Sequence, residues 1–162
     1  MLPMEAANGI STVSSNGHSP SENQDISQLV AALLEAARYG DLDDVKDLTS
    51  QGVLLSSRDS QGRTALHMAS GNGHLDVVRY LINYGVDLNA RNIEDNTPLH
   101  WAALNGHAQV VHEMILAGAN AAALNRYERT PLDEALSRDK MDVVNSMNAA
   151  TAALQLNVTH LN

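Results

Sequence analysis

The stretch TPLHWAALNGH, which begins at Thr97, decides the fold of this chain because close copies of it occur on either side. TALHMASGNGH begins at Thr64 and TPLDEALSRDK begins at Thr130, so the three copies follow one another with a constant period of 33. Three glycines keep the same spacing: Gly52, Gly85 and Gly118. A fixed period of this length is typical of a repeat protein, in which each unit buries its apolar face only against its neighbours.

Each repeat is predicted to form two helices joined by a tight turn. Thr97 offers a capping hydroxyl, and Pro98 follows at the first helical position, where a missing N–H costs nothing. Gly106 is expected to end this helix in a left-handed conformation. The second helix has apolar residues at spacing i, i+3, i+4 over 111–115, which gives it one apolar face.

The period of 33, together with a T-P-L-H-x-A line, resembles the ankyrin repeat. The line stands at 64–69 and 97–102, and the resemblance spans about residues 29–150. It implies an all-α fold: a short ankyrin-repeat solenoid of helix-turn-helix units with N- and C-terminal capping repeats. The expected units, within a domain at 27–156, are about 29–58, 59–91, 92–124 and 125–156.

The two ends of the chain are predicted to differ from the middle. Residues 1–26 are Ser-rich and acidic with few large apolar side chains, so a disordered tail is expected there. Residues 157–162 are expected to fray. The first unit lacks a T-P-L-H line, and the last replaces its histidine by Asp133, so both are interpreted as caps. The first unit is also rich in acid: Asp41, Asp43, Asp44 and Asp47.

Composition excludes several classes of function. The chain has 162 residues, a net charge of −9 and no cysteine, which rules out a disulfide scaffold, a thiolate zinc site and a cysteine nucleophile. No apolar run reaches the length of a membrane span, and no signal peptide is visible, so a cytoplasmic or nuclear protein is expected. The negative charge disfavours nucleic acid and membrane surfaces as partners and favours a basic protein.

Seven histidines raise the alternative of a metal or catalytic site. Two pairs, His67/His74 and His100/His107, have the same spacing, but that spacing repeats because the unit repeats. The resemblance implies that the T-P-L-H histidine bonds the backbone of adjacent repeats and that the Gly-His histidine packs at the turn. No phosphate-binding loop or nucleophile motif is present. We therefore expect no enzyme activity, no cofactor and no metal.

The resemblance also implies where a partner would bind. Ankyrin repeats bind other proteins through a concave surface made of loop tips and the ends of the first helices. Trp101 could instead pack between repeats, and the loop tips could have varied by drift. The positions that match this surface are Ser60, Gln61, Arg63, Asn72, Ile93, Glu94, Asp95, Asn96, Trp101, Leu104, Asn105, Arg126, Tyr127 and Arg129.

The expected function is thus a non-enzymatic protein-interaction module, a scaffold or adaptor that is monomeric on its own. A first alternative is a chaperone that escorts a basic client such as a ribosomal protein. Residues 99–107 resemble the middle repeat of a yeast ankyrin chaperone for a basic small-subunit ribosomal protein, and 125–135 resemble plant ankyrin-repeat proteins. A second alternative is a regulatory subunit of an enzyme.

Overall fold

The computed structural model describes residues 20–159, and within that range the chain is all-helical, with eight helices and no strand. This confirms the predicted all-α stack of helix pairs. The helices are α1 (Pro20–Tyr39), α2 (Leu42–Ser50), α3 (Ala65–Gly71), α4 (Leu75–Asn83), α5 (Pro98–Leu104), α6 (Ala108–Leu116), α7 (Pro131–Ser137) and α8 (Met141–Thr159).

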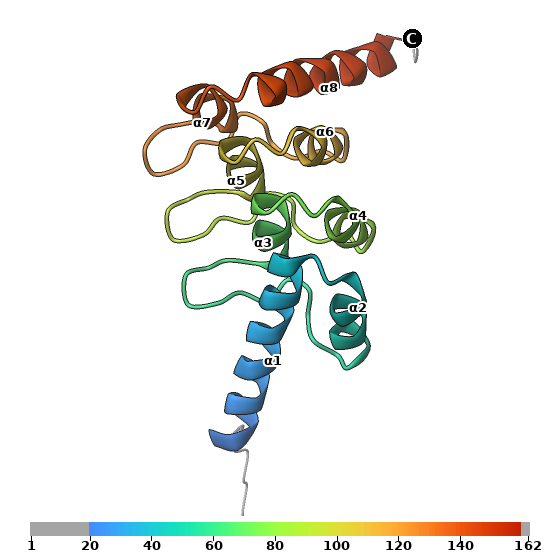
Figure 1. Ribbon diagram of the computed structural model, residues 1–162, viewed down its shortest axis with the longest axis vertical. Helices are drawn as coiled ribbons and strands as arrows, with labels where there is room; N and C mark the ends of the chain where they lie inside the picture. The colour runs from blue at the N-terminus through green and yellow to red at the C-terminus, as the bar shows by residue number, and fades with distance from the viewer. Residues whose placement is uncertain (1–19, 160–162) are drawn as a thin grey trace, which may run out of the picture.

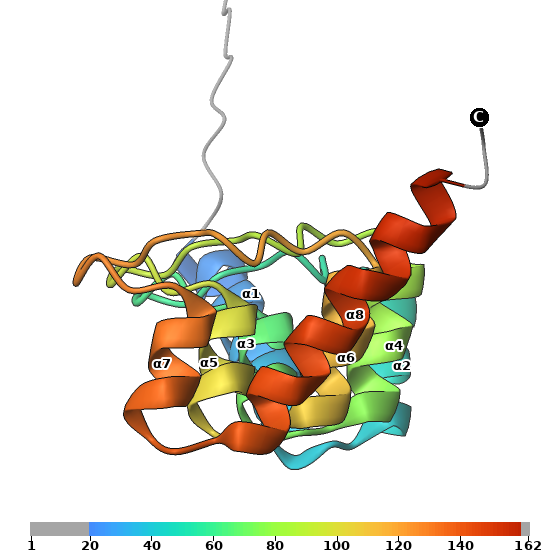
Figure 2. The same ribbon diagram turned by 90° about the horizontal axis from the view of Figure 1, so that it is seen from above.

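The helices form two stacked rows (Figure 1). The inner row runs α1, α3, α5, α7, and the outer row runs α2, α4, α6, α8; neighbours within each row are in contact. Three loops, at about 51–64, 84–97 and 117–130, leave the outer helices and return to the inner ones. Figure 2 shows these loops lying together as a layer across one end of the helix rows. No helix between residues 20 and 159 is long and apolar enough to cross a membrane.

The core is made of aliphatic side chains and alanine. Leu66 and Leu99 of the inner row and Met114 of the outer row are almost completely buried. Ala69 and Ala102 are fully buried in α3 and α5, inner helices that contact each other. Small residues at these positions let the helices stack closely, so a chain with 3% aromatic residues still fills its interior.

The T-P-L-H histidines join adjacent repeats, as the resemblance implies. The Nδ1 atom of His67 accepts the backbone N–H of Thr64 at 3.2 Å, so its Nε2 carries the proton and donates to the carbonyl oxygen of Asn96 at 2.9 Å. Because the ring is buried, the pKa of His67 is lowered to about 4. His100 repeats this geometry, with Nε2 bonded to the carbonyl of Arg129 at 2.9 Å.

The Gly-His histidines join the repeats at the other end of the inner helices. The Nε2 atom of His74 lies 2.8 Å from the carbonyl oxygen of Arg38, and that of His107 lies 3.1 Å from the carbonyl of Gly71. Between residues 20 and 159, no group of three or more metal-ligating side chains is placed to hold an ion. These four histidines therefore belong to the repeat framework.

A left-handed residue ends each inner helix. Gly73 and Gly106 have φ of 77° and 84°, as predicted, and Asp139 occupies the same position in the last unit with φ of 53°. A residue with a Cβ atom is strained in this region, whereas glycine is not. The last unit thus keeps the left-handed turn, but it has Asp139 where the two preceding units have a glycine that adopts this conformation without strain.

We expect Asp139→Gly to raise the free energy of unfolding by up to about 1 kcal/mol, since the relief of strain exceeds the added entropy of the unfolded chain. Urea unfolding of both proteins measures the difference. The reverse change, Gly73→Asp, should destabilise, because a Cβ atom there would lie 2.5 Å from the ring of His107. Destabilisation by Asp139→Gly would contradict the strain argument.

Both terminal helices are longer than the sequence predicts. Helix α1 begins at Pro20 rather than near Ser27, and α8 continues to Thr159, beyond the predicted end at 156. Leu33 and Leu34 are buried in the base of the stack, and a helix anchored there extends at little cost over the residues that precede it. The rest of the predicted tail, 1–19, and the last residues, 160–162, lie outside the described residues.

Candidate functional site

The loop tips are built by one Asx residue per repeat. Asp59, Asn92 and Asn125 occupy the same position of successive repeats, and each side-chain oxygen accepts the backbone N–H groups two and four residues further on, at 2.9 to 3.1 Å. Asp and Asn favour such turns because their short side chains reach their own backbone. These three residues are not among the positions predicted from the sequence, although their regular spacing and their place shortly before the capping threonine could have identified them.

Adjacent loop tips are joined by backbone hydrogen bonds. The N–H of Ile93 donates to the carbonyl of Gln61 at 3.0 Å, and the N–H of Arg126 donates to the carbonyl of Glu94 at 3.0 Å. Asp95 has a left-handed φ of 58°, the conformation that Gly62 and Glu128 adopt at the same position. The three tips therefore form one continuous strip with a fixed backbone.

A cavity of about 240 Å³ lies where the second and third of these loops meet the inner helices α5 and α7. Six residues predicted from the sequence line it: Glu94, Asn96, Trp101, Leu104, Tyr127 and Arg129. Five further residues complete the lining: His100, Asn125, Glu134, Ser137 and Arg138. Helix ends and loop tips from two repeats thus form one recess.

Trp101 packs between repeats and also lines the cavity. Its ring packs edge-on against the ring of His67, with centroids 5.4 Å apart, and its Cε3 atom would lie 3.1 Å from a Cβ atom on Gly71. The side chain remains half-buried and also lines the cavity. An aromatic surface held by packing on one side and open on the other is suited to contact a ligand with little loss of entropy.

Tyr127 and Arg129 line the outer wall of the cavity, and Arg126 lies beside Tyr127. Tyr127 is 60% exposed, and the guanidinium of Arg126 lies 5.5 Å from its ring centroid. Arg129 lies on the cavity side, with its Nη1 atom 3.7 Å from the Oε2 atom of Glu134. Tyrosine and arginine are enriched at protein interfaces, where they combine apolar contact area with hydrogen-bonding groups.

Asn125 and Glu134 hold this wall in place. The Nδ2 atom of the buried Asn125 donates to Asn96 Oδ1 at 3.0 Å and to Glu134 Oε1 at 2.9 Å. Asn125 therefore connects two loop tips and helix α7 through one side chain. The position of Glu134 in its repeat is that of Trp101 in the preceding one, so the register of the repeat could have identified it.

The family profile described as Ankyrin repeats (3 copies) matches residues 33–124 and 88–154. The chain belongs to the ankyrin-repeat family. This confirms the predicted family and, with the stacked helix pairs, the predicted solenoid. No curated protein matches the chain. Ankyrin repeats generally mediate protein–protein interaction and are typically non-enzymatic.

The other predicted residues of the ankyrin surface do not line the cavity. Ile93, Asp95, Asn105 and Arg126 flank it, whereas Ser60, Gln61, Arg63 and Asn72 belong to the preceding repeat. Three of these side chains already have partners within the chain. Arg63 bonds Asp59 at 2.7 Å, and the Nδ2 atoms of Asn72 and Asn105 donate to backbone carbonyls at 2.8 Å. Their roles in binding remain predictions.

Proposed function

We propose that this ankyrin-repeat protein binds a partner protein, without chemistry of its own, through the recess between its second and third loop tips. The observation that carries this proposal is the convergence of Trp101, Leu104 and Tyr127 with charged side chains around one cavity. An apolar centre with a polar, charged rim is the usual composition of a specific interface. The protein is expected to act as a monomeric adaptor in the cytoplasm or nucleus.

Charge supports a basic segment as the ligand. The exposed acids of α2 and its N-cap, together with Asp95 and the half-buried Glu94 at the middle tip, account for much of the net charge of −9. Such charges mainly raise the rate of association with a positively charged partner. An escort for a basic client, such as a ribosomal protein, is the specific form of this function that the charge distribution favours.

Site-specific photo-crosslinking in cells tests the proposed surface. A photoreactive phenylalanine analogue at Tyr127 should form covalent products with a partner. The same group at Tyr39, which is 71% exposed on α1, serves as the control and should form none of those products. No product from Tyr127, or the same products from both positions, would contradict the proposal. A partner identified in this way then serves for the two rate measurements below.

The first rate measurement concerns the acidic tip. Glu94→Gln combined with Asp95→Asn should slow association by up to about tenfold at low salt and flatten its salt dependence, with little effect on dissociation. Asparagine is chosen because it tolerates the left-handed backbone at Asp95. Surface plasmon resonance at two ionic strengths measures both rates. An acidic partner, or an unchanged association rate, would contradict the basic-ligand proposal.

The second rate measurement concerns the aromatic wall. Tyr127→Ala should accelerate dissociation about tenfold or more without lowering the Tm, because the ring is exposed in the free protein. Trp101→Ala should accelerate dissociation as well, but with a lower Tm, since its ring also packs on His67. Unchanged dissociation in both variants would show that the recess is not the contact surface.

A further inference from the structure

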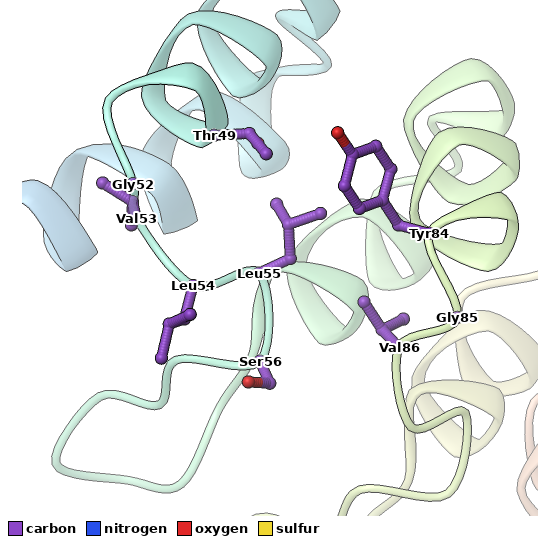
Figure 3. Close-up of a pocket in the computed structure, with 9 residues that line it drawn as sticks. All are labelled: Thr49, Gly52, Val53, Leu54, Leu55, Ser56, Tyr84, Gly85 and Val86. Carbon is purple, nitrogen blue, oxygen red and sulfur yellow. The ribbon is translucent and has the colours of Figure 1, made fainter.

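A second, apolar groove lies on another part of the molecule, where α2 and α4 end and their loops begin. Its volume is about 350 Å³. Figure 3 shows Leu55, Tyr84 and Val86 pointing into the same space, with Thr49 facing them from α2. Leu54 lines its rim, and the groove shares no residue with the recess described above.

The residues of this groove depart from the repeat pattern. Leu54 stands where the next two repeats have Asp87 and Asn120, whose side chains accept backbone N–H groups at 2.9 and 3.0 Å. A leucine cannot make this turn-stabilising bond, and Leu54 is 71% exposed. The first repeat thus has a solvent-exposed apolar side chain where the others have a structural polar one.

Tyr84 also departs from the repeat pattern, because it places an exposed aromatic ring where the other repeats have none. The equivalent positions hold Gln51 and Ala117, whereas Tyr84 is 59% exposed and its ring contacts the ring of Tyr80 at a centroid distance of 4.9 Å. Natural sequences break their local rules mainly at functional sites. Two such departures on opposite sides of one groove therefore indicate a contact surface.

The charges around the groove indicate which partner it suits. The helices α2 and α4 both end at it, so their negative dipole ends point toward it, and neither has a basic residue in its last turn. Asp47 lies in the last turn of α2, and Asp87 follows Val86 at the rim; both are exposed. No lining residue is charged. On the side of Asp87, Arg58 lines an adjoining pocket and donates to the carbonyl oxygens of Gly62 and Arg91. A cation is therefore favoured mainly at the ends of α2 and α4.

We propose that this groove is a second docking surface, which binds a protein segment presenting a leucine-like side chain between lysine or arginine residues. The apolar side chain would enter between Leu55, Tyr84 and Val86, and the flanking cations would lie against the two helix ends and their aspartates. This surface goes beyond the proposed function, because it is separate from the recess at the loop tips and would allow the protein to hold two segments at once.

Two synthetic peptides test this assignment on the full chain. One has the sequence Lys-Lys-Leu-Leu-Lys-Lys and the other Glu-Glu-Leu-Leu-Glu-Glu, with capped ends. In NMR titrations of the labelled protein, the lysine peptide should shift the backbone amides of 53–56 and 84–86, with a Kd in the millimolar range or below. It should bind at least about tenfold more tightly than the glutamate peptide.

The residues at the equivalent positions of the other repeats define a variant that removes the exposed apolar side chains of the groove. Leu54→Asn with Tyr84→Ala installs the residues of the equivalent positions Asn120 and Ala117 without adding a charge, so the Tm should change little, whereas affinity for the lysine peptide should fall at least about tenfold. Leu124→Asn changes an exposed loop leucine outside the groove and should leave binding intact. Trp101→Ala should also leave it intact, which separates this surface from the recess.

Three results would overturn the proposal. The first is the absence of shifts in these amides at millimolar lysine peptide. The second is equal binding of the two peptides, which would remove the argument from charge. The third is binding that survives Leu54→Asn with Tyr84→Ala.

Discussion

Removing residues 125–162 should make the protein insoluble or lower its Tm by on the order of 10 °C or more. Helix α8 of the last repeat covers α6, where Val111 and Met114 are fully buried. Ser146 also donates to the carbonyl of Ala108 at 2.7 Å. A truncated stack would expose this face to water, and terminal repeats are what protects such faces in solenoid proteins.

A shorter deletion provides the matched control. Removing only residues 157–162 takes away exposed positions of α8 and leaves Val143 and Met147 in the interface with α6. That protein should keep a Tm close to the full-length value. Circular dichroism melts of the three proteins compare them directly. A soluble chain ending at residue 124 with an unchanged Tm would show that the last repeat is not a cap.

Acidification from pH 7 to pH 5 should lower the free energy of unfolding by about 2 kcal/mol through His67 alone. In the folded chain the pKa of His67 is about 4, because the ring is buried, whereas the unfolded side chain titrates near 6.5. Between these values the unfolded chain binds more protons, so stability is fully present above about pH 6.5 and falls as the pH decreases toward 4. Burial lowers the pKa of His100 as well, in the same direction.

The geometry explains why protonation is unfavourable. The Nδ1 atom of His67 accepts the N–H of Thr64, so a proton on Nδ1 would face a donor that cannot move away. Urea unfolding at several pH values measures the loss. His67→Gln has no group that titrates there and should show a smaller loss between pH 7 and pH 5, whereas His112→Asn, on α6, should keep the full loss. An equal loss in the wild type and His67→Gln would exclude this origin.

The positions of the inner and outer helices were predictable because they depend on local chemistry repeated at a fixed period. A capping threonine begins α3, α5 and α7; a proline follows it in α5 and α7, and a glycine ends α3 and α5. The length of the terminal helices was not predictable in this way. Residues 20–26 have a weak pattern of their own and are helical as an extension of the buried segment at Leu33 and Leu34.

The candidate sites were predictable only in part. Family register indicated the loop tips and Trp101, and six of those positions do line one recess. Glu134 and Asn125 were missed although the register of the repeat marks both positions, whereas the hydrogen bond between them depends on two segments meeting in space. The groove at Leu54 and Tyr84 was missed as well. The register of the repeat marks both residues as departures, but only the tertiary structure brings segments 52–56 and 84–86 together around one groove.

The sequence by itself determined the repeat and the helix pairs, since these follow from residue chemistry at a constant spacing. Its resemblance to ankyrin repeats determined the family and implied the framework role of the histidines. Only the tertiary structure decided which loop-tip side chains are open to a partner and which are bonded within the chain, as Arg63 is to Asp59. The physical reason is that repeat spacing places backbones in register, whereas recesses and exposed apolar surfaces form between side chains of neighbouring repeats, where the sequence varies from one unit to the next.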